Sequence, residues 1–150
     1  MDARSSYREA SVRGASPVRL VICLYEQAIE DLRRAVIALE KGAIEIRTRE
    51  INHALLVIAQ LQGSLDMERG GEVAKNLAQF YGLVRAGLTE AQVKQSARLL
   101  ERQISQLVLV YEAWLEVERA VAKPNPPTPA PTSDSPAISS PATSFADWNA

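Results

Sequence analysis

Residues 16–41 read S-P-V-R-L-V-I-C-L-Y-E-Q-A-I-E-D-L-R-R-A-V-I-A-L-E-K, and this stretch decides the fold class. Ser16 and Pro17 form a typical helix start, because serine caps free backbone amides and proline at the first helical position loses no hydrogen bond. Gly42 marks the end of the helix. Between these limits, apolar residues recur at alternating steps of four and three: Val21, Tyr25, Ala28, Leu32, Ala35 and Leu39. This pattern predicts a long amphipathic helix that packs against other helices.

The same periodicity predicts three further helices. The second is expected from about residue 44 to 67, after which Gly70-Gly71 breaks the chain, and a shorter third helix runs to about Leu88. Thr89-Glu90-Ala91-Gln92 has the form of a capping box, so the fourth helix is expected to open there and to end before Pro124. Strand periodicity is absent. Short connections favour antiparallel neighbours, so we expect an all-α, antiparallel up-down-up-down four-helix bundle.

Composition divides the chain into three parts. Residues 1–15 form an N-terminal arm in which Tyr7 and Val12 stand among charged residues, and residues 16–122 form the bundle. From residue 123 the sequence is rich in Pro, Ser and Thr, with seven of the eight prolines and no Lys or Arg from Pro124 onward. Such a segment buries too little apolar surface to offset its ordering entropy, so residues 123–150 are expected to be a disordered tail.

Charge and composition exclude several classes of protein. The net charge is −1, and the basic residues alternate with Glu rather than forming the clustered basic stripe of a nucleic-acid binder. The single cysteine, Cys23, fits a reducing compartment. The N-terminus lacks a secretory signal, and apolar runs stay short of the ~20 residues that span a bilayer. We therefore expect a cytoplasmic protein that does not insert into membranes.

Catalytic and metal signatures are weak. Glu50 and His53 have the Glu-x-x-His spacing of di-iron bundles, but those sites need two such motifs and the chain has one His. A histidine phosphotransfer motif would require Lys and Gly where Leu56 and Val57 stand. We favour His53 as a polar residue on an amphipathic helix. Phosphate-binding loops, nucleophile elbows and CxxC pairs are missing from the sequence, so we expect no enzyme activity and no cofactor.

The fourth helix carries more apolar residues than one seam can hold. Beyond the seam it has Leu99, Val108, Leu109, Val110, Leu115 and Val117. A bundle helix is usually covered on one broad face only, so the surplus is either covered by the arm, by a second subunit or by a partner, or is scattered surface without a role.

Several short motifs in order make the chain resemble the flagellin export chaperone family, FliS. The resemblance rests on Tyr7, Val12, Ala15-Ser16-Pro17, Leu20, Leu24-Tyr25, Ile58-Ala59-Gln60-Leu61, Leu65-Asp66, Gly70-Gly71-Glu72-Val73-Ala74, Leu77, Phe80-Tyr81 and Trp114. It covers roughly residues 5–120. Glu26-Gln27 and Cys23 depart from the family pattern, and the proline-rich tail is not typical of it.

The resemblance implies a cytosolic bundle that binds the disordered C-terminal region of flagellin, prevents its premature polymerisation and presents it to the type III flagellar export apparatus. Its arm would cover part of the groove when flagellin is absent. Matching positions make Tyr7 and Val12 arm residues and place Leu20, Leu24 and Tyr25 at or beside the groove. With the surplus residues Leu99, Val108 and Val110, these form the expected partner-binding set. An export-gate component or a flagellar regulator is a further partner that the resemblance leaves open.

Two other hypotheses concern assembly and the tail. A non-enzymatic helical adaptor could dimerise through the fourth helix, whereas a chaperone of this type should be chiefly monomeric without its client. In the tail, Phe145 and Trp148 are three residues apart and could dock in the groove in place of a client. A solvated tail with two incidental aromatic residues is the simpler alternative.

Overall fold

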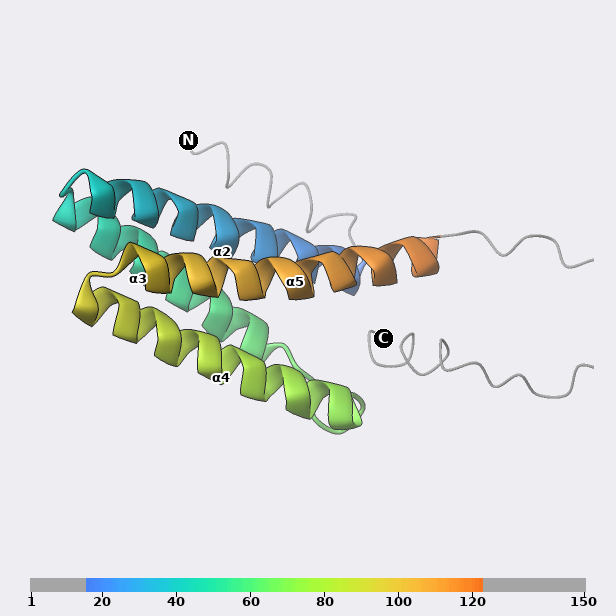
Figure 1. Ribbon diagram of the computed structural model, residues 1–150. Coiled ribbons are helices and arrows are strands. Elements are labelled where there is room, and N and C mark those ends of the chain that lie inside the picture. The colour runs from blue at the N-terminus through green and yellow to red at the C-terminus, as the bar shows by residue number, and fades with distance from the viewer. Residues whose placement is uncertain (1–15, 123–150) are drawn as a thin grey trace, which may run out of the picture.

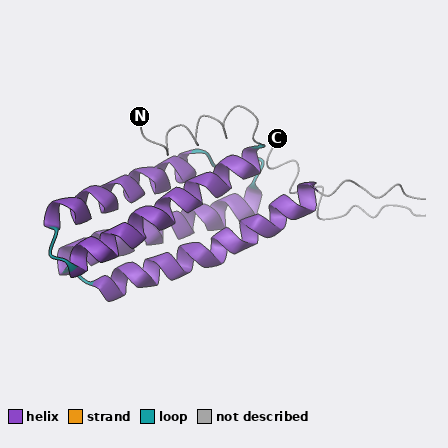
Figure 2. Ribbon diagram, turned by 90° about the horizontal axis from the view of Figure 1, so that it is seen from above, coloured by secondary structure: helices purple, strands orange, loops and turns teal. Residues whose placement is uncertain are grey.

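The computed structural model describes residues 16–122, which form an antiparallel bundle of four helices (Figure 1). The helices are α2 (Pro17–Glu40), α3 (Ile44–Gly63), α4 (Gly71–Lys94) and α5 (Ala97–Ala122). Both α2 and α4 pack against α3 and α5, so the helices follow chain order around the core. Seen from above, the described part consists of helices and loops (Figure 2). The predicted all-α four-helix bundle is confirmed, while the division into arm, bundle and tail stays a prediction because residues 1–15 and 123–150 lie outside the described residues.

The first helix begins where the sequence predicts. The Ser16 Oγ accepts a hydrogen bond from the Arg19 backbone N–H at 3.2 Å, and Pro17 occupies the first helical position. The helix ends at Glu40, and Gly42 then takes a φ of +72°, a backbone conformation that glycine adopts without steric penalty.

The second helix is shorter than predicted. It ends at Gly63 rather than near Met67, and Ser64 then donates from its hydroxyl to the Leu61 carbonyl at 2.8 Å. The Asp66 side chain accepts hydrogen bonds from the backbone N–H groups of Glu68 at 3.1 Å and Arg69 at 3.0 Å. These local side-chain bonds satisfy backbone groups in a turn, and they therefore compete with continuation of the helix.

The predicted boundary between the third and fourth helices is wrong. Thr89 lies inside α4, where its hydroxyl donates to the Arg85 carbonyl at 3.0 Å instead of capping a new helix. The helix ends five residues later at Lys94, its C-cap Gln95 has a φ of +52°, and the Ser96 N–H closes the end by bonding the Ala91 carbonyl. The Ser96 hydroxyl, not that of Thr89, caps α5 by accepting the Leu99 N–H at 3.1 Å.

The core follows the predicted seams. It is built from aliphatic side chains of all four helices and three large aromatic residues, Tyr25, Tyr81 and Trp114. Val93 is an exception: a fourth helix that started at Thr89 would carry it in the core-facing seam, but it lies on α4 and is 77% exposed. The aliphatic core explains why the fold is stable with so few aromatic residues.

Candidate functional site

Two polar contacts fix which side of α5 faces α2. The Tyr111 hydroxyl donates to the Glu26 carboxylate at 2.7 Å, and the Arg19 guanidinium binds both oxygens of Glu118 at 2.8 and 3.1 Å. Burial alone would lower the pKa of Arg19, but the adjacent Glu118 carboxylate outweighs it and raises the pKa above the usual value. The start of α2 is therefore held against the end of α5 in an antiparallel arrangement.

The other side of α5 meets α4 at a glycine. A Cβ atom on Gly87 would lie 2.3 Å from Nε2 of Gln103, so the end of the Gln103 side chain packs on the bare backbone of α4 and would have to shift if residue 87 carried a side chain. The Gln103 side chain is nearly buried, and its Oε1 has no hydrogen-bond partner among residues 16–122. Gln103 therefore marks the face of α5 that is directed at α4.

Apolar side chains continue this contact along both helices. Positions four or seven residues apart share a face of a helix, so Leu99, Val110 and Val117 lie on the same side of α5 as Gln103. On α4, Val73, Phe80 and Leu83 share the side of Gly87. Leu83 is 66% exposed and Val73 is 40% exposed, and the other four are half-buried. We call these six residues the α4–α5 strip: Val73, Phe80, Leu83, Leu99, Val110 and Val117.

The opposite flank of α5 is also apolar. Tyr111 contacts α2 and therefore marks this flank. Ile104 lies seven residues before Tyr111 and Leu115 lies four residues after it, so both share its side of the helix. Val108 lies four residues after Ile104 and belongs to the same side. All three are half-buried against the core. Of the surplus residues in the fourth helix, only Leu109 is well exposed, at 69%. The surplus thus forms two half-covered flanks, one toward α2 and one toward α4.

The predicted binding residues on α5 are divided between these flanks. Leu99 and Val110 belong to the α4–α5 strip, whereas Val108 lies on the α2 flank. From the sequence, Val73 and Phe80 stood out only as part of the family resemblance, and Leu83 and Gly87 were not singled out. The seven-residue spacing of Val73, Phe80 and Gly87 was the signal that could have revealed the strip.

The predicted residues on α2 occupy other positions. Asp31 contacts α3 and therefore marks the face of α2 that is directed at α3. Leu24 lies seven residues before Asp31 and Leu20 lies eleven residues before it, so both share this face, and both are half-buried. Tyr25 is completely buried in the core. Tyr7 and Val12 lie outside the described residues. The described members of the predicted set are therefore spread over three faces and the core.

Basic residues lie beside one end of the strip. Leu99 also lines a hollow of about 430 Å³ on α5, together with Arg98, Glu101, Arg102 and Ser105. The pKa of the Glu90 carboxyl on α4 is lowered, mainly by its hydrogen bond and ion pair with Lys94 and to a lesser degree by the charge of Arg102. Arg102 therefore lies close to α4 as well.

The centre of the bundle holds a buried pair of tyrosines. Tyr25 of α2 donates to the hydroxyl of Tyr81 of α4 at 2.8 Å, and the rings are 6.1 Å apart at a tilt of 55°. Burial raises the pKa of Tyr25, and the contact with Tyr81 raises it further, whereas a hydrogen bond with Trp114 opposes the rise. Burial raises the pKa of Tyr81 to about 12. Both hydroxyls therefore stay neutral near physiological pH.

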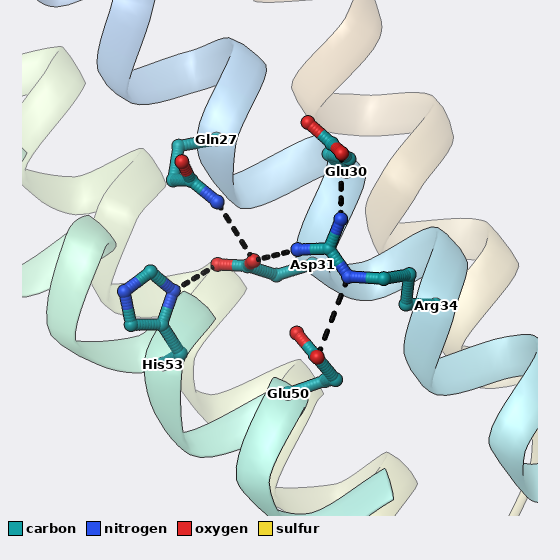
Figure 3. A network of polar contacts seen from close by, with 6 residues as sticks. All are labelled: Gln27, Glu30, Asp31, Arg34, Glu50 and His53. Atoms are coloured by element: carbon teal, nitrogen blue, oxygen red, sulfur yellow. Dashed lines mark hydrogen bonds and ion pairs between the residues drawn. The ribbon is translucent and has the colours of Figure 1, made fainter. Parts of the chain in front are cut away.

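A charged network joins α2 to α3 (Figure 3). The Asp31 carboxylate is fully buried and receives hydrogen bonds from Gln27 at 2.9 Å, from Arg34 at 2.6 Å and from the His53 Nδ1. Arg34 also pairs with Glu30 at 2.6 Å and with Glu50 at 3.4 Å. Burial would lower the pKa of Arg34, but the surrounding carboxylates, Glu50 foremost, outweigh it and raise the pKa.

This network includes both residues of the Glu50-x-x-His53 motif. Glu50 turns to Arg34 and His53 turns to Asp31, so the two side chains serve the α2–α3 interface rather than a common metal ion. His53 is half-buried on α3, a helix with one face on the core, which agrees with its interpretation as a polar residue on an amphipathic helix. Among residues 16–122, no cluster of His, Cys, Asp and Glu is suited to hold a metal. Nor does any helix in this part have the length and hydropathy required to span a membrane.

Comparison with known proteins gives concordant matches. A family model described as flagellar protein FliS matches residues 1–121. The flagellar secretion chaperone FliS of Salmonella typhimurium is 32% identical over 110 residues, which cover 73% of this chain and 82% of that protein. The FliS chaperone of Vibrio cholerae is 32% identical over 116 residues, 75% of this chain and 85% of that protein. The flagellar secretion chaperone FliSB of Pseudomonas aeruginosa is 36% identical over 106 residues, 71% and 84% of the two chains.

Proposed function

Because the chain belongs to the FliS family of flagellar secretion chaperones, we propose that it binds the C-terminal region of flagellin. The family is non-enzymatic, in agreement with the expectation from the sequence. In this proposal the protein holds flagellin in the bacterial cytosol, prevents its premature polymerisation and delivers it to the type III flagellar export apparatus.

The α4–α5 strip is the observation that supports this proposal most directly. It offers partly covered apolar side chains on two neighbouring helices, including Leu83 and Val73, which are largely exposed. An amphipathic client segment can lay its apolar face on such a surface and fold as it binds. Coupled folding of this kind typically buries about 1,000–3,000 Å² and loses several kcal/mol to ordering of the client.

The other predicted contact residues give the client a longer path. Val108 lies on the α2 flank of α5, and Leu20 and Leu24 lie on the face of α2 toward α3. A single client chain that contacts Val108, Leu20 and Leu24 as well as the α4–α5 strip has to wrap around several faces of the bundle. We propose that the strip receives one apolar segment and that further segments extend to the other faces, while residues 1–15 cover part of this surface until the client arrives.

Titration of an isotope-labelled C-terminal flagellin peptide with the full chain, followed by NMR, tests the proposal. Binding is expected to shift and disperse the peptide resonances. Leu83→Glu places a charge within the strip and is expected to weaken affinity about tenfold or more. Leu109→Glu is the matched control, because Leu109 is equally exposed, at 69%, but points away from α4.

The outcomes separate the parts of the proposal. Equal effects of the two substitutions would remove the strip as the contact surface, and unchanged peptide spectra at high chain concentration would reject flagellin as the client. The adaptor that dimerises through α5 remains a second candidate function, supported by the half-covered flanks of that helix. Sedimentation equilibrium distinguishes it, since the chaperone should be a monomer without its client.

A further inference from the structure

The last part of the chain carries an acidic aromatic motif that the family match does not reach. The matched region ends at residue 121, whereas residues 145–148 read Phe-Ala-Asp-Trp. We propose that this motif docks on its own bundle, at the hollow on α5 where the α4–α5 strip meets Arg98 and Arg102. Docked there, it would act as an intramolecular competitor of the client, and this regulatory consequence rests on the proposed function.

The hollow suits such an occupant in size and chemistry. Its volume is about 430 Å³, it is lined by the strip residue Leu99, and it carries two arginines against one acid, Glu101. An aromatic ring can pack on Leu99 while an arginine stacks on its face, and a tryptophan is the strongest partner for such a cation–π contact. The carboxylate of Asp147 adds a charged partner for the second arginine.

Charge complementarity favours this segment over other parts of the chain. Residues 124–150 contain two acids, Asp134 and Asp147, and no Lys or Arg. The hollow carries Arg98 and Arg102 against Glu101, and the charge of Arg102 also lowers the pKa of Glu90 on α4, which is bound to Lys94 at 2.9 Å. An acidic aromatic segment is thus attracted to this end of the bundle, whereas a basic one would be repelled.

The covalent connection is long enough for the motif to reach the hollow. Arg102 lies 20 residues before the end of α5 at Ala122, a distance of roughly 30 Å along the helix axis. The 22 residues from 123 to 144 include seven prolines, and a proline-rich chain of this length reaches up to roughly 68 Å when fully extended. A covalent linker that can span the distance between two sites makes the contact intramolecular, and so raises the effective concentration of the motif at the hollow. A weak contact is therefore sufficient to hold the motif on the bundle for much of the time.

Docking would reduce the fraction of molecules open to a client. Leu99 lines both the hollow and the strip, so an occupied hollow removes one end of the proposed client surface. Apparent client affinity falls by the fraction of molecules that remain open, and the tail is thus expected to slow client association several-fold.

Fluorine NMR of the full chain labelled with 5-fluorotryptophan tests the docking without any client. The chain has two tryptophans, Trp114 and Trp148, and the Trp148→Phe variant identifies the resonance of the latter. In the wild type this resonance is expected to differ from that of a free peptide of residues 140–150. Arg102→Glu should return it to the free position, and the double variant Arg102→Glu with Asp147→Lys should restore the docked position. Arg33→Glu on α2, an exposed arginine outside the hollow, should leave it unchanged.

Three results would overturn the proposal. The first is a Trp148 resonance that already coincides with that of the free peptide. The second is a docked resonance that Arg102→Glu does not release, and the third is docking that depends on protein concentration, which would indicate a second copy. With client added, Trp148→Ala should accelerate association several-fold. Docking of Trp148 in a chain that binds no flagellin would refute the proposed function while leaving the docking itself established.

Discussion

The hydroxyl of Tyr25 donates to that of Tyr81 at 2.8 Å across the centre of the bundle, which joins the diagonal helices α2 and α4. These helices are otherwise connected through α3 and α5. A buried hydroxyl needs a partner, so each tyrosine supplies what the other requires. The pair is expected to control how stability responds to alkaline pH.

Stability should fall as pH rises above about 10. Burial raises the pKa of Tyr81 to about 12, and that of Tyr25 is raised as well, whereas both tyrosines ionise near pH 10 in the unfolded chain. The unfolded state therefore releases protons first, and the free energy of unfolding decreases by roughly 1.4 kcal/mol per pH unit for each tyrosine between pH 10 and 12. Urea unfolding at pH 9, 10 and 11 measures this slope. Tyr81→Phe should reduce the slope by the contribution of one tyrosine. A slope identical to that of the wild type would show that ionisation of Tyr81 does not cause the loss of stability.

Removal of the Asp31 carboxylate should destabilise the bundle strongly. Asp31 is fully buried and holds Gln27, Arg34 and His53 together, so Asp31→Ala leaves buried donors unsatisfied and is expected to lower the free energy of unfolding by about 3 kcal/mol. Glu30→Ala is the control, because Glu30 binds the same arginine from an exposed position and should matter by less than about 1 kcal/mol. Chemical unfolding compares the two, and equal losses would show that burial of the network has no special role.

Two glycines in α4 should respond in opposite directions to alanine. Gly87→Ala would place a Cβ 2.3 Å from the end of the Gln103 side chain, so this nearly buried side chain must shift; we expect the cost to exceed the gain in helix propensity and to leave a net loss of about 1 kcal/mol. Gly82→Ala meets nothing within 4 Å and should stabilise the helix by about 0.5–1 kcal/mol. Thermal unfolding of both variants tests this. If Gln103→Ala does not recover stability in the Gly87→Ala background, the steric explanation is wrong.

The cap of α5 can be tested at two hydroxyl residues. Ser96→Ala removes the acceptor for the Leu99 N–H and should lower stability by about 1 kcal/mol. Thr89→Ala removes a back-bond inside a helix, and because alanine has the higher helix propensity the change should be neutral or slightly stabilising. Urea midpoints distinguish these results. The reverse order would place the helix start at Thr89 after all.

Deletion of residues 1–14 should speed client association and leave the bundle folded. If the arm covers part of the client surface, its removal increases the open fraction and therefore the observed on-rate. Circular dichroism reports on the fold, and stopped-flow mixing with a labelled flagellin peptide measures the rate. An unchanged rate, or loss of the helical signal, would reject a lid function for the arm.

The sequence predicts the fold class well because apolar periodicity and helix signals act locally. It misplaces the start of α5 because Thr89-x-x-Gln92 matches the ideal capping box, while the true cap, Ser96, has Leu99 rather than Glu or Gln at the third helical position. The preceding helix ends at Lys94, and its C-cap Gln95 takes a left-handed conformation without the glycine that usually marks such an end.

The candidate site is less predictable from sequence, because it depends on pairing between distant residues. The sequence places Tyr25 at or beside a groove through the family resemblance. In the structure it is a core residue, because its hydroxyl finds a buried partner in Tyr81, 56 positions away. Likewise, apolar residues on the last helix indicate surplus surface, but assigning Val108 to one flank and Val110 to the other requires the positions of α2 and α4.

The charged network between α2 and α3 fixes how these two helices are aligned along their axes. Seams of leucine, isoleucine and alanine tolerate a slip of one helical turn, about 5.4 Å, because successive turns present similar surfaces. A slip of that size would separate Asp31 from His53 and leave a buried carboxylate short of a donor. At Gly87 the contact between α4 and α5 is instead a glutamine side chain against bare backbone. We therefore expect α4 to shift more readily than the α2–α3 pair when a ligand of imperfect shape is bound.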